Sequence, residues 1–187
     1  MSAAKSEVIL IGPVRTGKST VGKLLSEKLG RPQISLDDLR WKYFREIGYD
    51  DTLAKTIRRQ GGFLALVLYW HLFDAYAIER VLAEHHNCIF DFGAGAGASE
   101  SQENMARGEL ALAAYPNVVL ILPSPNTDET LHVLKARDSH PPADLNFDLN
   151  RHFLERGFYR RLAKHTVFTK GKLPEETRDE ILGLVVW

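Results

Sequence analysis

The sequence predicts an α/β domain, a parallel sheet of five strands with helices on both faces. Short apolar runs of strand length alternate five times with longer segments whose apolar residues recur at helical spacing. The apolar runs lack the polar alternation of a half-exposed strand, as expected of parallel strands covered on both sides. Strands that alternate with helices in this way form right-handed βαβ units.

Each predicted strand leads into a helix. The strands are expected at 8–11, 33–36, 87–92, 117–122 and 166–169. The helices are expected at 17–29, 39–47, 51–85 (in two parts, broken near Gly61 and Gly62), 102–114, 127–136, 150–164 and 174–184. Gly30 is the expected C-terminal cap of the first helix and Thr127 an expected N-cap. Pro174 falls in a first turn, where its missing N–H costs no hydrogen bond.

Composition predicts one globular domain over residues 1–187. Hydrophobic residues make up 44% and charged residues 26% of the chain, which are ordinary globular values. The 24 Lys and Arg balance the 24 Asp and Glu, so no overall field favours nucleic acid or an anionic membrane as a partner. The longest apolar stretch, 63–73, contains His71 and is interpreted as a buried helix too short to cross a bilayer.

The cysteine content and the N-terminus favour a cytoplasmic location. Cys88 is the single cysteine, so an intramolecular disulfide and a thiolate zinc cluster are both excluded. Lys5 and Glu7 precede the first apolar run, and no small-residue cleavage site follows it, so no export signal is expected.

A phosphate-binding motif joins the first strand to the first helix. Residues 12–19, Gly-Pro-Val-Arg-Thr-Gly-Lys-Ser, fit the pattern G-x-x-x-x-G-K-[ST]. The glycines permit a tight turn whose N–H groups surround an anion, and the helix presents its positive end to that anion. The expected nucleotide-binding residues are Gly12, Pro13, Val14, Arg15, Thr16, Gly17, Lys18, Ser19 and Thr20.

This motif predicts a three-layer P-loop NTPase fold that uses ATP and Mg²⁺. Lys18 is expected to reach the β- and γ-phosphates, and the Ser19 hydroxyl to bind magnesium. Asp91 ends the third strand, where an acidic residue either holds magnesium through water or caps the strand end.

Two adjacent carboxylates follow the second strand. Ligands of open α/β sheets bind outside the carboxyl ends of the strands, which is where Asp37 and Asp38 are expected. An aspartate there can orient an acceptor hydroxyl and take its proton. Asp37 is the first candidate for this catalytic role and Asp38 the second. Capping of the following helix is the structural alternative for both.

The motif and its surroundings resemble the shikimate kinase family. The run Gly-Lys-Ser-Thr-Val-Gly-Lys-Leu-Leu within 12–30 is similar to the start of these enzymes and their small-molecule kinase relatives. The similarity continues with the acidic pair, a glycine-rich turn at 93–97, and the segment 155–163, Glu-Arg-Gly-Phe-Tyr-Arg-Arg-Leu-Ala. Residues 138–149 occupy the place of the family's lid.

The resemblance implies a role for several residues. Asp37 would hold the substrate hydroxyls near the transferred phosphate, and Gly93 and Gly95 would belong to the substrate-binding turn. Arg156 would bind the substrate carboxylate, and Arg137, beside the lid, the adenine or the phosphates. The family's magnesium aspartate corresponds to Ser35, so that role would pass to Asp38 or Asp91.

One departure from the family concerns the acceptor. A second arginine that binds the shikimate carboxylate corresponds to Leu64, so shikimate would lose a charge-assisted hydrogen bond worth about 1.5–3 kcal/mol. The apolar segment 63–70 indicates either a less polar acceptor pocket or a helix buried for packing.

The predicted function is an ATP-dependent transfer of phosphate to a hydroxyl of a small molecule. Polyol acids, nucleosides and antibiotics all remain candidate acceptors. A nucleotide-binding regulatory protein is an alternative, which the missing arginine favours. An NTP hydrolase, with water in place of the acceptor, is another.

Overall fold

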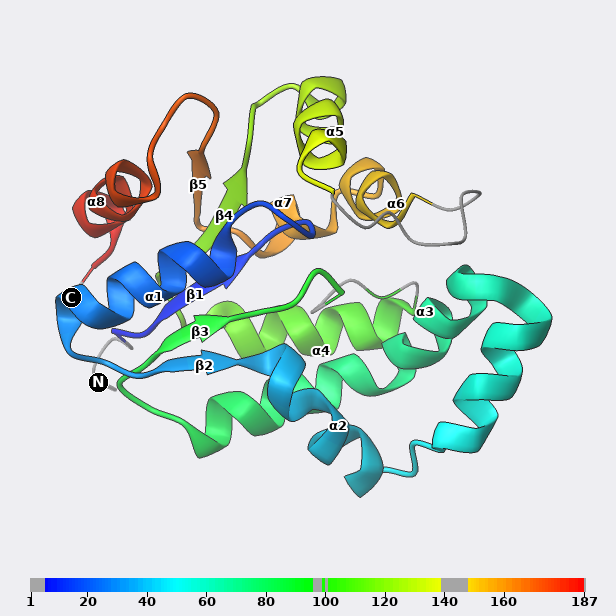
Figure 1. Cartoon of the computed structure of the whole chain (residues 1–187). Helices are drawn as coiled ribbons and strands as arrows, with labels where there is room; N and C mark the ends of the chain where they lie inside the picture. Colours follow the sequence, from blue (N-terminus) through cyan, green and yellow to red (C-terminus); the bar gives the residue numbers. More distant parts are fainter. Residues whose placement is uncertain (1–5, 96–98, 100, 139–147, 187) are drawn as a thin grey trace.

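The computed structural model describes residues 6–95, 99, 101–138 and 148–186. Its centre is a five-stranded parallel sheet with the strand order β2-β3-β1-β4-β5 (Figure 1). The strands are β1 (Val8–Ile11), β2 (Gln33–Ser35), β3 (Ile89–Asp91), β4 (Val118–Leu122) and β5 (His165–Phe168). The predicted parallel sheet of five strands is confirmed.

Helices cover both faces of the sheet, as predicted. One face packs against α1 (Lys18–Leu29) and α8 (Pro174–Leu184), through Val21, Leu25 and Ile181. The other face packs against α2 (Leu36–Glu46), α3 (Asp51–Glu84), α4 (Gln102–Ala113), α6 (Leu149–Glu155) and α7 (Phe158–Leu162). The remaining helix, α5 (Thr127–Ala136), lies beside α6 (Figure 1).

The strands divide their side chains between two hydrophobic cores. In β1, Ile9 and Ile11 join the core under α2, α3 and α4, whereas Val8 and Leu10 join the core under α1 and α8. All four side chains are buried, because both faces of the strand are covered. This double burial explains the continuous apolar run in the sequence.

Gly30 and Gly62 end or break helices where the sequence predicts it, whereas the break at Gly157 is not predicted. Gly30 adopts φ 64° after α1, and Gly62 breaks α3 with φ 72° and ψ −165°. Gly157, at φ 70°, separates α6 from α7, where the sequence pattern predicts one helix over 150–164. That prediction is wrong because Gly157 adopts a left-handed conformation that ends α6 and starts α7. The residues on both sides have helical spacing, so the sequence pattern does not reveal this turn.

The start of one helix and the cap of another also differ from the prediction. Ser35 caps α2 by accepting a hydrogen bond from the Asp38 N–H at 3.3 Å, so the helix begins at Leu36 rather than at Leu39. Asp37 and Asp38 therefore lie in the first turn of α2. Asn126, rather than Thr127, caps α5, since its side-chain oxygen accepts from the Glu129 N–H at 2.9 Å.

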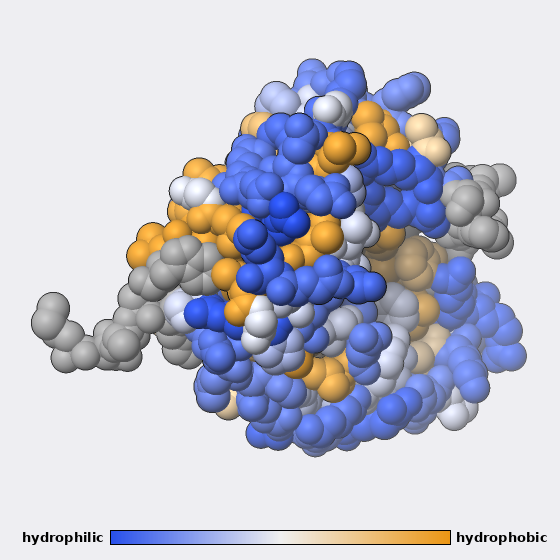
Figure 2. Space-filling model, turned by 60° about the vertical axis from the view of Figure 1, so that its left-hand side comes forward, coloured by the Kyte–Doolittle hydropathy of each residue, from blue (hydrophilic) through white to orange (hydrophobic). Residues whose placement is uncertain are grey.

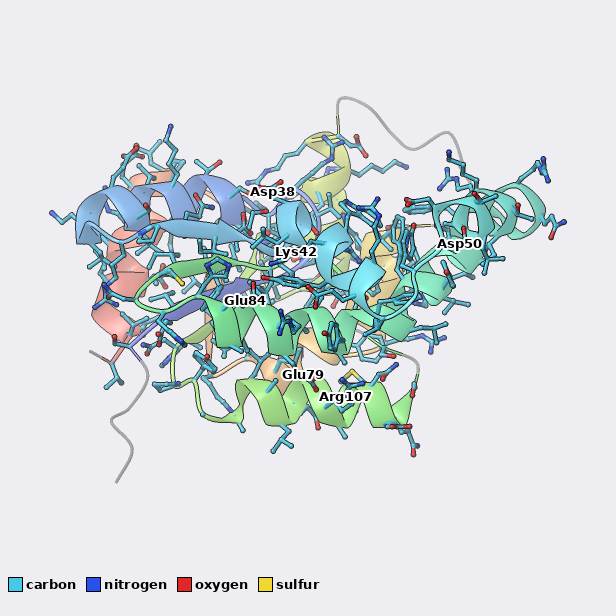
Figure 3. All side chains as sticks on the ribbon, turned by 90° about the horizontal axis from the view of Figure 1, so that it is seen from below. Asp38, Lys42, Asp50, Glu79, Glu84 and Arg107 are labelled. Carbon is cyan, nitrogen blue, oxygen red and sulfur yellow. The ribbon has the colours of Figure 1, made fainter. Side chains whose placement is uncertain are left out.

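The long helix α3 is held between α2 and α4. Ion pairs join Lys42 to Glu84 at 3.0 Å and Arg107 to Glu79 at 2.6 Å, from opposite sides of α3 (Figure 3). By length and composition alone α3 could cross a membrane, a test that core helices of soluble proteins also pass. The apolar stretch 63–73 alone is too short to cross a bilayer, but the helix that contains it is long enough. Burial of Phe73 and Ile78 in the core nevertheless supports the predicted packing role.

Candidate active site

The register of the sheet brings three strand ends together. Asp91, the last residue of β3, is opposite Leu10 of β1 and Ser35 of β2. The phosphate-binding motif after β1 and the carboxylates after β2 thus meet at the carboxyl edge of the sheet. This is the edge where open α/β folds bind ligands.

The loop between β1 and α1 has the backbone expected of a phosphate cradle. Gly12 adopts φ 140° and Gly17 φ 97°, and Arg15 between them adopts φ 67°. A Cβ at Gly12 would lie 2.6 Å from the Ile121 carbonyl oxygen, so no side chain fits there. Among the described residues no side chain caps α1, so its first N–H groups remain available to an anion.

Lys18 lies inside this loop, folded back on it. Its Nζ donates to the carbonyl oxygens of Gly12 at 2.9 Å and of Pro13 at 2.8 Å, and the residue is 7% exposed. Burial lowers the pKa of Lys18 from 10.5 to about 8, while the charges of Asp91 and Asp37 oppose that shift. The Lys18 ammonium therefore interacts electrostatically with the carboxylate of Asp91, at the end of β3, and with that of Asp37, after β2.

Asp91 and Ser19 form the candidate magnesium site. Asp91 is 6% exposed, and burial raises the pKa of its carboxyl; the Ser19 hydroxyl and the Lys18 charge act in the opposite direction. Gln33 donates to the Asp91 Oδ2 at 3.3 Å. A hydroxyl and a carboxylate beside a phosphate cradle are hard oxygen donors of the kind Mg²⁺ takes, and Mg²⁺ usually keeps several waters.

The phosphate loop is also tied to the segments that flank the predicted lid. The Val14 N–H donates to the Asn150 Oδ1 at 2.8 Å. Arg15 and Arg137 each donate to the other's carbonyl oxygen, at 3.0 and 3.2 Å, and Arg15 also pairs with Asp138. Arg137 therefore lies beside the phosphate loop. Residues 139–147 of the predicted lid lie outside the described residues.

Asp37 and Asp38 have different surroundings. Asp37 packs against the turn after β3, and a Cβ added to Gly93 would lie 2.0 Å from the Asp37 Oδ1. The Tyr159 hydroxyl holds that turn by donating to the Ala94 carbonyl oxygen at 2.6 Å. Asp38 is exposed on α2 (Figure 3), and it is not among the described residues that line a cavity next to Asp37. The structure thus favours Asp37 over Asp38 for a role toward an acceptor.

A cavity of about 130 Å³ opens beside Asp37. Apolar side chains make most of its wall, and the polar groups come from Asp37 and Arg40 on α2 and from His71 and Asp74 on α3. Its lining consists of Val14, Asp37, Arg40, Val67, Trp70, His71, Asp74, Ala94, Gly95, Leu149 and Phe153. The surface view shows a hollow with hydrophobic residues inside it (Figure 2). Of the predicted substrate turn, Gly95 lines the cavity, and Gly93 touches Asp37.

The predicted carboxylate-binding arginine lines another cavity, although its charge still reaches His71. Arg156 lines a second cavity of about 480 Å³, together with Ser99, Gln102, Met105, Phe158 and Arg161. It is absent from the described lining of the cavity beside Asp37. Leu64, at the place of the family's other arginine, is 36% exposed.

Sequence reasoning missed Arg40, His71 and Asp74. Arg40 lies one helical turn after Asp37, a spacing that brings two side chains to one helix face. His71 and Asp74 have the same spacing and interrupt the otherwise apolar segment 63–78 of α3. Isolated polar residues on a buried helix face are the signal that points to them, because such groups are costly to bury without a partner.

Comparisons with known proteins agree with this geometry. No family model matches the chain. The chain is 27% identical to the shikimate kinase of Streptomyces coelicolor, with 95% of this chain and 94% of the relative covered. It is 29% identical to the shikimate kinase of Persephonella marina, with coverages of 95% and 98%. A solved structure of the shikimate kinase from Acinetobacter baumannii in complex with shikimate superposes with a TM-score of 0.64 at 21% identity, covering 96% of this chain and 92% of that one.

The chain is a shikimate-kinase-like P-loop kinase. The predicted fold is confirmed by the solved relative, and the predicted class of enzyme, a small-molecule kinase, is confirmed by the sequence relatives.

Gly93→Ala is expected to lower phosphate transfer by this shikimate-kinase-like enzyme about tenfold or more while nucleotide binding persists. The new methyl group would overlap the Asp37 carboxylate and displace it from its place at the cavity. Steady-state kinetics beside calorimetric nucleotide titration measures both effects. Gly183→Ala, where a Cβ meets open space on α8, is the matched control. Wild-type transfer by Gly93→Ala would show that Asp37 needs no fixed position.

Asp74 is expected to make the kinase less stable as the pH rises from about 4 to about 7. Burial raises the pKa of Asp74 from 3.8 to about 7, although Arg40 opposes the shift. Across this window the folded state keeps a proton that the unfolded chain has lost, so the free energy of unfolding falls with rising pH. Melting temperatures of wild type and Asp74→Asn from pH 4 to 7 measure this effect. Parallel curves for the two proteins would contradict it.

Proposed function

We propose that this kinase transfers the γ-phosphate of ATP to a hydroxyl group of a small molecule, with Mg²⁺ as cofactor. The observation that carries the proposal is the meeting of a phosphate cradle and a carboxylate-bearing cavity at one edge of the sheet. Lys18 inside the cradle interacts electrostatically with Asp37, which lines the cavity. A phosphate donor and a hydroxyl acceptor bound in these two places would lie side by side.

The phosphate loop supplies most of the binding for the nucleotide. Its backbone N–H groups and the uncapped start of α1 offer donors and a positive dipole end to the phosphates. Lys18 adds a full charge that can exchange its two loop carbonyl partners for phosphate oxygens. Because the charge that develops during phosphoryl transfer lies on phosphate oxygens, these donors stabilise the transition state.

Ser19 and Asp91 are the residues that would hold magnesium, Asp91 directly or through water. Such an ion, when bound, neutralises charge on the β- and γ-phosphates. Asp91 keeps its carboxylate near Lys18 and Ser19 in a buried position, which fits this role.

Asp37 is the proposed acceptor-orienting group and base. Its carboxylate accepts the hydroxyl proton as the acceptor oxygen bonds to the γ-phosphorus and the bond to the β–γ bridging oxygen breaks, which leaves ADP. The side chain is 59% exposed at the cavity, so an acceptor can reach it. Arg40 fixes it from one side, with its Nη1 3.4 Å from the Asp37 Oδ1.

The partner is thus a small hydroxyl-bearing compound, and the proposal requires neither nucleic acid nor a membrane. We place the reaction in the cytoplasm, where ATP and a reduced Cys88 are both expected. The similarity to shikimate kinases supports this class of acceptor, since one solved relative holds shikimate itself.

Incubation with ATP, Mg²⁺ and a panel of hydroxyl compounds, followed by phosphorus NMR, tests the proposal. A new phosphomonoester resonance that requires both ATP and the acceptor is the expected result. Free phosphate without phosphomonoester would identify an NTP hydrolase. Nucleotide binding without turnover would identify a regulatory protein.

A further inference from the structure

Two polar side chains in the cavity beside Asp37 carry atoms without hydrogen-bond partners among the described residues. They are the Asp74 Oδ2 and both ring nitrogens of His71. Asp74 is 4% exposed and His71 3% exposed, and both line the cavity. Buried polar atoms of this kind are costly unless something bonds to them. Their placement in a cavity wall indicates a ligand that supplies those bonds.

Arg40, the one arginine in the described lining of this cavity, already contacts protein carboxylates. The Arg40 Nη2 lies 2.9 Å from the Asp74 Oδ1, and its Nη1 lies 3.4 Å from the Asp37 Oδ1. Its guanidinium also lies over the rings of Trp41, Phe44 and Trp70, at 4.9 to 5.3 Å from their centroids. These contacts hold its fork of donors toward protein carboxylates rather than toward a ligand carboxylate.

No second cation balances a ligand carboxylate within the described lining. Arg40 is the only lining side chain there with a permanent positive charge, and it faces two aspartates. Burial and the nearby cations His152, Arg40 and Arg156 lower the pKa of His71 to about 4, so its ring is neutral at pH 7. Within this lining a ligand carboxylate would lie beside Asp37 and, where it is ionised, Asp74, with Arg40 as the one permanent positive charge. Arg156 acts on His71 from outside the described lining.

We propose that the acceptor is a small alcohol without a carboxylate, which donates a hydrogen bond to Asp74 from an amine or a second hydroxyl. This inference rests on the proposed kinase function and specifies its substrate class. The apolar face of the acceptor lies against Val67, Trp70 and Phe153, and its reacting hydroxyl lies at Asp37.

The hydrogen-bonding capacity of the cavity matches such a compound. When ionised, the Asp74 carboxylate can only accept hydrogen bonds, so its free oxygen then takes an N–H or O–H donor. Neutral His71 offers one donor and one acceptor, which suits a hydroxyl group. An ammonium group beside Asp74 would favour its ionised form and bring the charges of Asp37, Arg40, Asp74 and the ligand into balance.

A series of cyclohexane polyols with one ring and one hydroxyl pattern tests the charge preference. Its members differ in a single substituent, a carboxylate, its carboxamide or the aminomethyl group. The kcat/KM for phosphorylation is expected to be at least about tenfold higher for the amine than for the carboxylate, with the amide between them. Ligand-observed NMR in the presence of Mg²⁺ and ADP is expected to give the same order of binding.

Asp74→Asn separates the role of the charge from that of the cavity shape. The variant keeps the size of the side chain and an oxygen for Arg40 but removes the negative charge. The ratio of amine to carboxylate kcat/KM is expected to fall at least about fivefold. Asp51→Asn, at the exposed start of the same helix, is the matched control and keeps the wild-type ratio.

The outcomes distinguish this inference from the function on which it rests. Phosphorylation that is fastest for the carboxylate, or an unchanged ratio in Asp74→Asn, would overturn the inference and leave the kinase proposal standing. Preferred binding of the amine with no phosphomonoester from any compound would support the inference and contradict the kinase proposal. A series in which no member binds or reacts would overturn the inference.

Discussion

Lys18→Ala is expected to lower kcat/KM for phosphate transfer by about 10²- to 10³-fold, with a matching loss of nucleotide affinity. The side chain carries the charge at the centre of the phosphate loop, where its Nζ lies within 2.9 Å of two loop carbonyl oxygens. No other lysine lies in that loop. Coupled-enzyme kinetics and calorimetric titration with ATP and Mg²⁺ measure the two effects.

Lys23→Ala is the control for that variant. Lys23 lies on the same helix but is exposed, so its removal is expected to leave affinity and rate unchanged. Thermal unfolding decides whether Lys18→Ala has kept the fold, since loss of the lysine leaves two loop carbonyls without their donor. A folded Lys18→Ala protein with wild-type turnover would place the reaction outside this loop.

Asp37→Asn is expected to lower kcat by about 10²- to 10⁴-fold while ATP affinity stays within a few-fold of wild type. The amide has the size of the carboxylate but cannot accept the hydroxyl proton. It also weakens the contact with Arg40. Single-turnover kinetics with saturating ATP isolates the transfer step, and calorimetry follows the affinity.

Asp38→Asn decides between the two adjacent candidates. Its carboxylate is exposed and lies outside the described cavity lining, so this variant is expected to retain most of the activity. A large loss in Asp38→Asn with little change in Asp37→Asn would reverse the assignment made from the geometry.

Local sequence patterns predict most of this fold because its strands are buried on both faces. The apolar run at β1 predicts a strand covered on both faces, and the glycine after α1 predicts the end of a helix. The break at Gly157 and the early start of α2 were harder to predict. They depend on a left-handed backbone and on a serine cap, which the apolar periodicity does not encode.

The candidate site likewise has one part that the sequence predicts and one part that it does not. The phosphate loop is one contiguous motif, so its residues can be found in the sequence alone. The cavity wall is assembled from α2, α3, α6 and the turn after β3, and the distances between these elements are set by packing. Arg40 and Asp74, 34 residues apart, form an ion pair that no local pattern predicts. Arg156, assigned by resemblance, lines another cavity, next to the left-handed turn at Gly157.

The burial of Lys18 couples nucleotide binding to proton uptake. With a pKa of about 8, part of the lysine population is neutral in mildly alkaline solution. A bound triphosphate favours the charged ammonium, so each binding event above about pH 8 draws protons from the buffer. The apparent binding enthalpy at pH 8.5 should therefore vary with the ionisation enthalpy of the buffer, whereas at pH 6.5 this lysine should contribute almost nothing to that variation. ATP affinity should decline as the solution becomes more alkaline.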